Sequence, residues 1–171
     1  MELRRSRHGE EETILSLYRS VLGEEFCVWN EYYPGPEEIR ADMASGGLRV
    51  LTENGAIIGA ISAIPENEMD EMSCWHIREH VREIARVVIG KEYRGRGLAG
   101  EMVKLLLPIL RREGAESVHL SAAVGNLPAV RTYDKLGFER VGEADMYGGH
   151  YYLMELSLRE DEDNDILRGG R

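Results

Sequence analysis

Residues 92 to 100 read Glu-Tyr-Arg-Gly-Arg-Gly-Leu-Ala-Gly, and this stretch carries most of the information about the fold. The residues before it, 82–89, are rich in branched apolar side chains, as in a buried strand. From Leu98 through Met102 to Leu110, apolar residues recur at the spacing of one helical face. Glycine suits the tight turn between them, because it adopts positive φ without steric cost. The sequence therefore predicts a strand, a glycine-rich turn and a helix in direct succession.

A turn of this kind is a candidate site for a phosphate group. The first N–H groups of a helix have no partner within the helix, and the helix dipole favours negative charge at that end. Two arginines add positive charge beside the turn. We therefore expect a phosphate to be held by the backbone amides of Arg94, Gly95, Arg96, Gly97, Leu98 and Ala99.

The same residues admit other interpretations. Gly95, Gly97 and Gly100 match the G-x-G-x-x-G pattern of dinucleotide-binding folds, but the next expected strand, 117–124, is followed by no acidic residue to bind a ribose. A P-loop needs Lys-Ser or Lys-Thr at its end, which the stretch 90–97 lacks. A tight turn without any ligand is a third alternative.

Two motifs follow one another in the central part of the chain. Residues 94–99 fit the pattern Q/R-x-x-G-x-G/A, and Asn126 to Phe138 fit N-x-x-A-x-x-x-Y-x-x-x-G-F. In this order, and behind a strand at 83–89, the two motifs resemble those of the GNAT superfamily of N-acetyltransferases. One departure is Gly90-Lys91, where the family often has a polar residue and a proline.

The resemblance implies a fold of the α/β (α+β) class. The GNAT-like sheet would be mixed and mostly antiparallel, with about seven strands splayed at the cofactor site and about four flanking helices. The implied cofactor is acetyl-CoA, whose pantetheine arm would lie between two strands that part at a bulge. Backbone groups of Val87, Val88 and Ile89 would bind that arm, while residues 94–99 would hold the pyrophosphate. Asn126 would contact the cofactor as well, and it also has the position of a helix cap.

The rest of the chain supplies the elements that such a fold needs. The segments 48–52 and 56–64 flank an Asn-Gly pair, which is a strong hairpin signal. The charged stretch 65–79 is expected to be a long connection. Pro108 should kink its helix, at a cost of roughly 3 kcal/mol in a helix interior. Helices are expected at 14–22, 37–44, 98–114 and 126–136, and strands at 2–7, 48–52, 56–64, 82–89, 117–124, 138–145 and 151–158.

Acetyl transfer to an amine needs a base, because an ammonium ion has no lone pair with which to attack a thioester. The resemblance suggests Glu83, and partial burial would raise its pKa toward a useful range. An ordinary ion pair of Glu83 with Arg82 or Arg86 is the alternative. Tyr133 occupies the family's tyrosine position, from which its hydroxyl would protonate the leaving thiolate or hydrogen-bond the thioester sulfur. Packing as a core aromatic is the alternative for Tyr133. The resemblance also places a backbone N–H near Val88 against the developing oxyanion.

Aromatic residues in two expected loops are candidates for acceptor binding. Trp29, Tyr32 and Tyr33 lie close together in the sequence, and Trp75 lies in the connection 65–79. Beside acidic residues, exposed aromatic rings can hold a cationic amine, although each ring alone is equally compatible with core packing. Loops set the specificity for the acceptor, so the sequence predicts only its class. This class is a primary amine of a small molecule, peptide or protein.

Composition restricts the class of protein further. The 171 residues, of which 43% are apolar, predict one domain at 1–158 and a disordered acidic tail at 159–171. The net charge of −10 argues against a nucleic-acid partner. The sequence has no long apolar run, so we expect a cytoplasmic protein without a membrane partner. The spacing of Cys27 and Cys74 predicts two free thiols and no metal site.

The function predicted from the sequence is direct transfer of the acetyl group of acetyl-CoA to a primary amine. A noncatalytic acyl-CoA-binding or sensor module, which would keep the turn but lack the acid and base, is the alternative. A nucleotide-dependent oxidoreductase is a second rival. The last two strands offer edges through which a homodimer could form.

Overall fold

The computed structural model describes residues 1–65 and 67–160, and it contains one seven-stranded sheet in the order β1-β2-β3-β4-β5-β7-β6. All neighbouring strands are antiparallel except β4 and β5, which are parallel. The strands are β1 Glu2–Arg5, β2 Leu48–Glu53, β3 Ala56–Ile64, β4 Val81–Ile89, β5 Ser117–Ala123, β6 Glu139–Met146 and β7 Gly149–Ser157. The helices are α1 Glu11–Ser20, α2 Pro36–Ala44, α3 Leu98–Arg112 and α4 Leu127–Lys135, with short 3-10 turns η1 Glu68–Glu71 and η2 Lys91–Tyr93.

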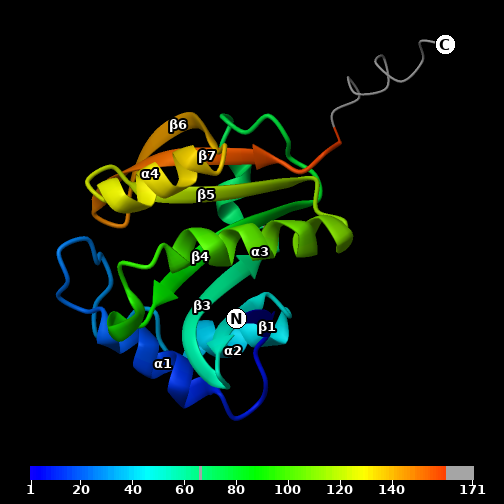
Figure 1. Ribbon diagram of the computed structural model, residues 1–171. Helices are drawn as coiled ribbons and strands as arrows, with labels where there is room; N and C mark the ends of the chain where they lie inside the picture. The colour runs from blue at the N-terminus through cyan, green and yellow to red at the C-terminus, as the bar shows by residue number, and fades with distance from the viewer. Residues whose placement is uncertain (66, 161–171) are drawn as a thin grey trace.

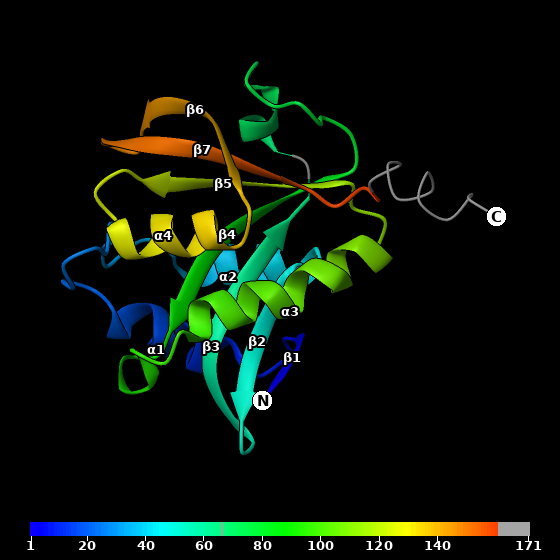
Figure 2. The same ribbon diagram turned by 45° about the horizontal axis from the view of Figure 1, so that its top comes forward.

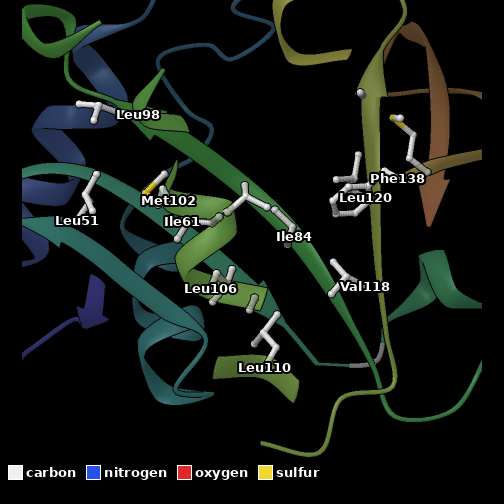
Figure 3. Packing of buried hydrophobic residues seen from close by; sticks show 14 of the residues in the cluster. Leu51, Ile61, Ile84, Leu98, Met102, Leu106, Leu110, Val118, Leu120 and Phe138 are labelled. Carbon is white, nitrogen blue, oxygen red and sulfur yellow. The ribbon is translucent and has the colours of Figure 1, made fainter. Parts of the chain in front are cut away.

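Helices cover both faces of the sheet (Figures 1 and 2). Helix α3 packs on β3 and β4 through one apolar face, which includes Leu98, Met102, Leu106 and Leu110 (Figure 3). A second cluster joins α1 and α2 to the opposite face of β2, β3 and β4. Each helix is amphipathic, so burial of its apolar stripe fixes which side of the sheet it covers.

The segment between β3 and β4 covers the part of the sheet that α1 and α2 leave open. Met69 and Trp75 from this segment pack on Leu153 of β7. Gly142 of β6 lies so close to Cys74 that an added Cβ would come within 3.0 Å of the Cys74 Cβ. The expected long connection is therefore an ordered layer that contains a 3-10 turn.

The two parallel strands pair over only a short distance. Their ladder joins Val81, Arg82 and Glu83 of β4 to the start of β5, and beyond this point no strand of the described residues pairs with β4 on that side. Figures 1 and 2 show β4 and β5 diverging from the end at which they are paired. Register against β3 shifts where Ala60 pairs with Val88 but Ser62 pairs with Ala85, which inserts an extra residue in β4.

These observations confirm the predicted fold class, and the expected elements are present with ends that differ by a few residues. Helix α3 continues through Pro108, whose ring lies on the exposed side of the helix. The carbonyl that Pro108 deprives of a partner, on the exposed Lys104, can therefore be hydrated. Most of the tail predicted to be disordered, 161–171, lies outside the described residues.

Candidate active site

The turn before α3 has the backbone geometry that anion binding requires. Gly95 and Gly97 have φ values of +73° and +69°, and an added Cβ on either would meet nothing within 4 Å. Among residues 1–65 and 67–160, no hydrogen bond engages the amides of residues 94–100. These amides therefore form an open array of donors at the positive end of a helix of 15 residues.

The arginines beside this turn are held by glutamates of neighbouring elements. Arg96 donates to both carboxylate oxygens of Glu53 in β2, at 3.1 and 2.7 Å. The Arg94 Nη1 atom lies 3.4 Å from Glu24 Oε2. These pairs are exposed and contribute little to stability, but they keep two guanidinium groups at the rim of the amide array.

Gly90, which stands where the resembled family often has a polar residue, is required by close packing. An added Cβ at this position would come within 3.1 Å of the Leu17 side chain and 3.3 Å of the Tyr93 ring. The Gly90 amide also donates to the Ile58 carbonyl oxygen at 2.8 Å. Glycine therefore lets the chain leave β4 between α1 and the glycine turn.

The diverging edge of β4 leads directly into this turn. Val88 and Ile89 have buried side chains on opposite faces, and Val87 packs partly buried against the α3 cluster. Since β4 lacks a neighbour beyond Glu83 on the β5 side, its main chain is available there to an extended ligand. The strand edge and the amide array together fit a long flexible molecule that ends in a diphosphate, such as the pantetheine arm and pyrophosphate of coenzyme A.

Asn126 caps α4 by accepting a hydrogen bond from the Ala129 amide at 3.2 Å.

The bulge in β4 is stabilised by a buried ion pair. Arg86 has a φ of +52°, which is unfavourable for a residue with a Cβ. Its Nε and Nη2 atoms donate to the two carboxylate oxygens of Asp42 in α2, both at 2.8 Å, and its Nη1 atom donates to the Tyr33 hydroxyl at 2.9 Å. The Ser62 hydroxyl also donates to Asp42, at 2.5 Å. Helix α2 thus stabilises the bulged conformation of β4.

Glu83 lies where β4 and β5 begin to part, on the face opposite α3. Burial raises the pKa of its carboxyl to about 7, against the opposing effects of a hydrogen bond from Asn67 and the charge of Arg86. Among the residues described, no arginine forms an ion pair with Glu83: Arg86 pairs with Asp42, and Arg82 donates to the Val81 carbonyl oxygen. The simple ion-pair interpretation is therefore wrong, and the carboxyl has the pKa of a group that accepts a proton near neutral pH.

Asn67 fixes the position of this carboxylate. Its Nδ2 atom donates to Glu83 Oε2 at 2.6 Å, while its Oδ1 atom accepts the Met69 amide at 2.8 Å. The second contact determines which end of the amide faces Glu83. Asp70 closes a reciprocal cap by accepting the Asn67 amide at 2.9 Å.

A buried histidine anchors Asp70 in turn. His119 of β5 is 0% exposed, and its Nδ1 atom lies 2.8 Å from Asp70 Oδ1. Its Nε2 atom lies 2.9 Å from the Ile77 carbonyl oxygen and 3.1 Å from Glu155 Oε1. Both ring nitrogens of His119 therefore face oxygen atoms, and the ring connects β5 to Asp70, to Ile77 and to Glu155 of β7.

Tyr133 of α4 is partly buried and packs edge-on against Phe138, with ring centroids 5.6 Å apart. Burial alone raises the pKa of its hydroxyl to about 12. The hydroxyl therefore stays protonated at neutral pH and is able to donate a proton or a hydrogen bond.

The four aromatic residues predicted to bind the acceptor have different environments. Tyr32 and Tyr33 are exposed at 80% and 41%. Trp29 packs edge-on against the buried Tyr18, and Trp75 is 3% exposed, stacked on His119 with ring centroids 3.9 Å apart. The Trp75 Nε1 atom donates to the Met69 carbonyl oxygen at 2.8 Å. Trp75 thus packs within the fold, as the alternative interpretation had it, and we do not retain it as an acceptor contact. Trp29 is partly buried, and its role stays a prediction.

Several residues near Glu83 escaped sequence analysis. The pKa of the hydroxyl of Tyr147, an exposed residue of the β6–β7 turn, is raised by burial and then by the charge of Glu83. Asn67 and Asp70 form a cap whose spacing is visible in the sequence. No sequence pattern predicts the bulge at Arg86, because a positive φ inside a strand follows from tertiary contacts.

The comparisons with known proteins agree with this geometry. The model of the Acetyltransferase (GNAT) family matches residues 14–138, which is more than half of the chain. The chain therefore belongs to the GNAT acetyltransferase family, whose acyl donor is acetyl-CoA.

Curated relatives match shorter stretches. The chain is 43% identical over 70 residues to N-alpha-acetyltransferase MAK3 of Arabidopsis thaliana, a match that covers 41% of this chain and 35% of the relative. It is 43% identical over 65 residues to mycothiol acetyltransferase of Corynebacterium glutamicum, covering 36% and 22%. The match to human N-acetyltransferase 8B is 25% identical over 116 residues and covers 62% and 48%. The chain thus spans less than half the length of each of these relatives.

Solved structures share the fold over nearly the whole chain. A GNAT family acetyltransferase of Streptococcus agalactiae has a TM-score of 0.76 at 20% identity, covering 94% of this chain and 96% of that one. The yncA protein of Salmonella typhimurium, solved with its cofactor acetyl-CoA, has a TM-score of 0.72 at 20% identity, with coverages of 94% and 95%. At this identity, the likeness concerns the fold.

Proposed function

We propose that this chain transfers the acetyl group of acetyl-CoA directly to a primary amine. The observation that carries the proposal is the continuity between the open edge of β4 and the unpaired amides of residues 94–100. This continuity offers one path for the pantetheine arm and the pyrophosphate, and it ends beside a carboxyl whose pKa is about 7.

The residues of the chain divide the work of the reaction. The amides of 94–99 bind the pyrophosphate, the β4 backbone from Val87 to Ile89 orients the arm, and Asn126 contacts the cofactor beside its own cap. Bound acetyl-CoA supplies the acetyl group as a thioester. A backbone N–H near Val88 stabilises the negative charge on the carbonyl oxygen. Glu83 accepts the proton of the acceptor amine, directly or through water, and Tyr133 donates to the leaving sulfur.

The acceptor approaches from the face opposite α3, where Glu83 lies. Tyr33 of the α1–α2 loop contacts Arg86 of β4, and its neighbour Tyr32 is exposed. The negative charge of Glu83 and Glu68 favours a cationic amine. One relative is named an N-alpha-acetyltransferase and another a mycothiol acetyltransferase. A small molecule, a peptide or a protein therefore remains the proposed class of acceptor.

An acetyl-CoA assay over an amine panel tests the function. The panel contains polyamines, amino acids, aminoglycosides and peptides, and release of coenzyme A is followed with and without each amine. Acetylation of at least one amine is expected. Binding of coenzyme A without transfer to any of them would favour the noncatalytic acyl-CoA-binding module.

The variant Tyr133→Phe tests the assigned acid. Turnover should fall more than about tenfold, because the sulfur loses its donor, while the dissociation constant of acetyl-CoA stays the same. Tyr152→Phe is the matched control, since Tyr152 of β7 is also partly buried but lies under the Arg140 guanidinium, 4.4 Å from it. Equal turnover in wild type and Tyr133→Phe would remove Tyr133 from the mechanism.

The proposed location is the cytoplasm, and the proposed assembly is a homodimer. Among the helices of residues 1–65 and 67–160, none combines the length and apolarity needed to cross a bilayer. Cys27 and Cys74 are free thiols, which agrees with the proposed cytoplasmic location. Formation of a homodimer through β6 and β7 stays a prediction.

A further inference from the structure

A cavity of about 350 Å³ opens at the far end of α3 from the glycine turn. Three of the residues that line it are arginines, from β1, β2 and β4, and one is a carboxylate, at the end of α3. These residues, which we call the arginine cavity, are Arg5, Arg49, Arg82 and Glu113.

The charges in the arginine cavity do not balance. Arg49 is 2% exposed, and its Nη2 atom donates to both carboxylate oxygens of Glu113, at 2.7 and 2.9 Å. The Arg5 Nη2 atom donates to the same carboxylate at 2.9 Å. Burial of Glu113 opposes its ionisation, but the two guanidinium groups outweigh this effect and lower the pKa of the carboxyl. One carboxylate therefore serves two cations.

Arg82 adds a third cation, for which residues 1–65 and 67–160 supply no carboxylate partner. Its Nη1 atom donates to the Val81 carbonyl oxygen at 2.8 Å, and within the described part of the chain it forms no ion pair. With Glu113 ionised, the three guanidinium groups leave a formal excess of two positive charges around one hollow. This excess occurs in a protein whose net charge is −10, so it is opposite in sign to the rest of the molecule.

The arginine cavity is separate from the proposed acetyl-transfer site. Alternation along β4 directs Arg82 to the same face as Ile84, which packs on α3, whereas Glu83 points to the other face. Leu110 lines the cavity, and it lies about 18 Å along the helix axis from Leu98 at the glycine turn. A ligand in the cavity would therefore bind without displacing coenzyme A.

From these contacts we infer that the arginine cavity binds a small oxyanion with a charge of about −2, in which phosphate or carboxylate groups meet the guanidinium groups. Guanidinium groups pair with the oxygens of either group in a planar, bidentate geometry. A concave site with positive walls concentrates anions even when the rest of the surface is acidic. Its volume is in the range of small-molecule sites, so the cavity accommodates a phosphate monoester or a dicarboxylate as well as an inorganic ion.

Titration of the CoA-saturated full chain tests the inference. Saturating coenzyme A occupies the amide array first, so that added phosphate cannot bind there. Calorimetry then measures binding of inorganic phosphate, and separately of succinate, at constant ionic strength. Saturable binding is expected for at least one of the two, and the stronger ligand distinguishes a phosphate from a dicarboxylate preference.

Two arginine variants locate the binding. Arg82→Gln should weaken binding at least fivefold, and it breaks no ion pair among the described residues, so the variant should fold. Arg112→Gln is the control, because Arg112 is exposed at the end of α3 and does not line the cavity. Arg5→Gln, which removes a mostly exposed side chain of the cavity, should weaken binding as well and serves if Arg82→Gln does not fold.

Two results would overturn the inference. One is the absence of any saturable heat with either anion in the CoA-saturated protein. The other is equal weakening by Arg112→Gln and by the cavity variants, which would indicate a nonspecific effect of net charge. Neither result bears on acetyl transfer, which is measured separately.

Discussion

The donor side and the acceptor side of the proposed active site are built in different ways. On the donor side, the binding groups are backbone amides of one short segment, 94–100, together with the strand that precedes it. On the acceptor side, the carboxyl of Glu83 depends on side chains from several segments. Asn67 before η1 donates to it, and Arg86 of β4, which itself contacts Tyr33 of the α1–α2 loop, acts on it through its charge.

This difference distinguishes a site that one segment of the chain forms from a site that several distant segments form together. A main-chain anion site needs only glycines and the start of a helix, so one stretch of sequence specifies it. The acceptor side depends on contacts between residues distant in the sequence, such as the 2.6 Å hydrogen bond from Asn67 to Glu83. We therefore expect substitutions to affect the two sides independently.

The largest effect should come from the buried charge cluster under the acceptor side. His119→Gln removes the ring that contacts both Asp70 and Glu155, leaving Asp70 its contact with Asn67 and Glu155 its contacts with His76 and Ile77, and it should lower the free energy of unfolding by about 3 kcal/mol. Urea denaturation measures this change. His150→Gln is the control, because His150 also lies between two carboxylates, at 2.6 and 2.7 Å, but is exposed to water. It should change stability little, since exposed ion pairs contribute little.

The same experiment tests whether the two sides are separable. The affinity of the folded His119→Gln variant for coenzyme A should equal that of the wild type, because the amide array does not contact the cluster. A parallel loss of affinity would show that the donor side depends on the acceptor side. Equal destabilisation by both histidine variants would show that burial of the His119 cluster is energetically unimportant.

A smaller effect is expected on the donor side. Gly97→Val places a branched side chain at a φ of +69°, a conformation that costs roughly 1–2 kcal/mol for a residue with a Cβ. Relaxation of this strain would turn the amides away, so the dissociation constant of coenzyme A should rise about tenfold. Isothermal titration calorimetry measures it.

Gly114→Val provides the matched control at the other end of α3. Gly114 has a φ of +91°, and an added Cβ would likewise meet nothing within 4 Å. The control variant should be strained in the same way but bind coenzyme A normally. Normal binding by Gly97→Val, or equally weakened binding by both, would contradict the assignment of the amide array.

The smallest expected effect is a shift in pH dependence. Asn67→Ser keeps a side chain that is able to cap η1 but removes the amide that donates to Glu83. That donor lowers the pKa of the carboxyl, so its loss should raise the pKa above about 7. Because the base acts when deprotonated, the acid limb of the kcat/KM profile should move to higher pH, by up to about one unit.

The variant Glu83→Gln defines the reference for this shift. Its profile should lack the limb, and adding Asn67→Ser to it should leave the remaining profile unchanged, because both variants act on one proton. A limb that stays in place or moves to lower pH in Asn67→Ser alone would refute the positioning role of Asn67.

Much of the fold was readable from the sequence because its signals are periodic or short. The Asn-Gly pair predicted the β2–β3 hairpin, and the apolar face from Leu98 to Leu110 predicted α3. Element ends were less certain, since the last turn of a helix or strand depends on its neighbours. The packing of Trp29 and Trp75 could not be predicted, because an aromatic residue in a loop has the same sequence signature whether it is exposed or buried.

The sequence by itself determined the glycine turn, the two motifs and the order of the elements, because each depends on residues close together in the chain. Tertiary structure alone decided that β4 bulges at Arg86 against Asp42, that Asn67 reaches Glu83 and that three arginines surround one cavity. The physical reason is that burial and charge pairing act between segments distant in sequence. The pKa of Glu83, about 7, is a product of those contacts and not of its neighbours in the chain.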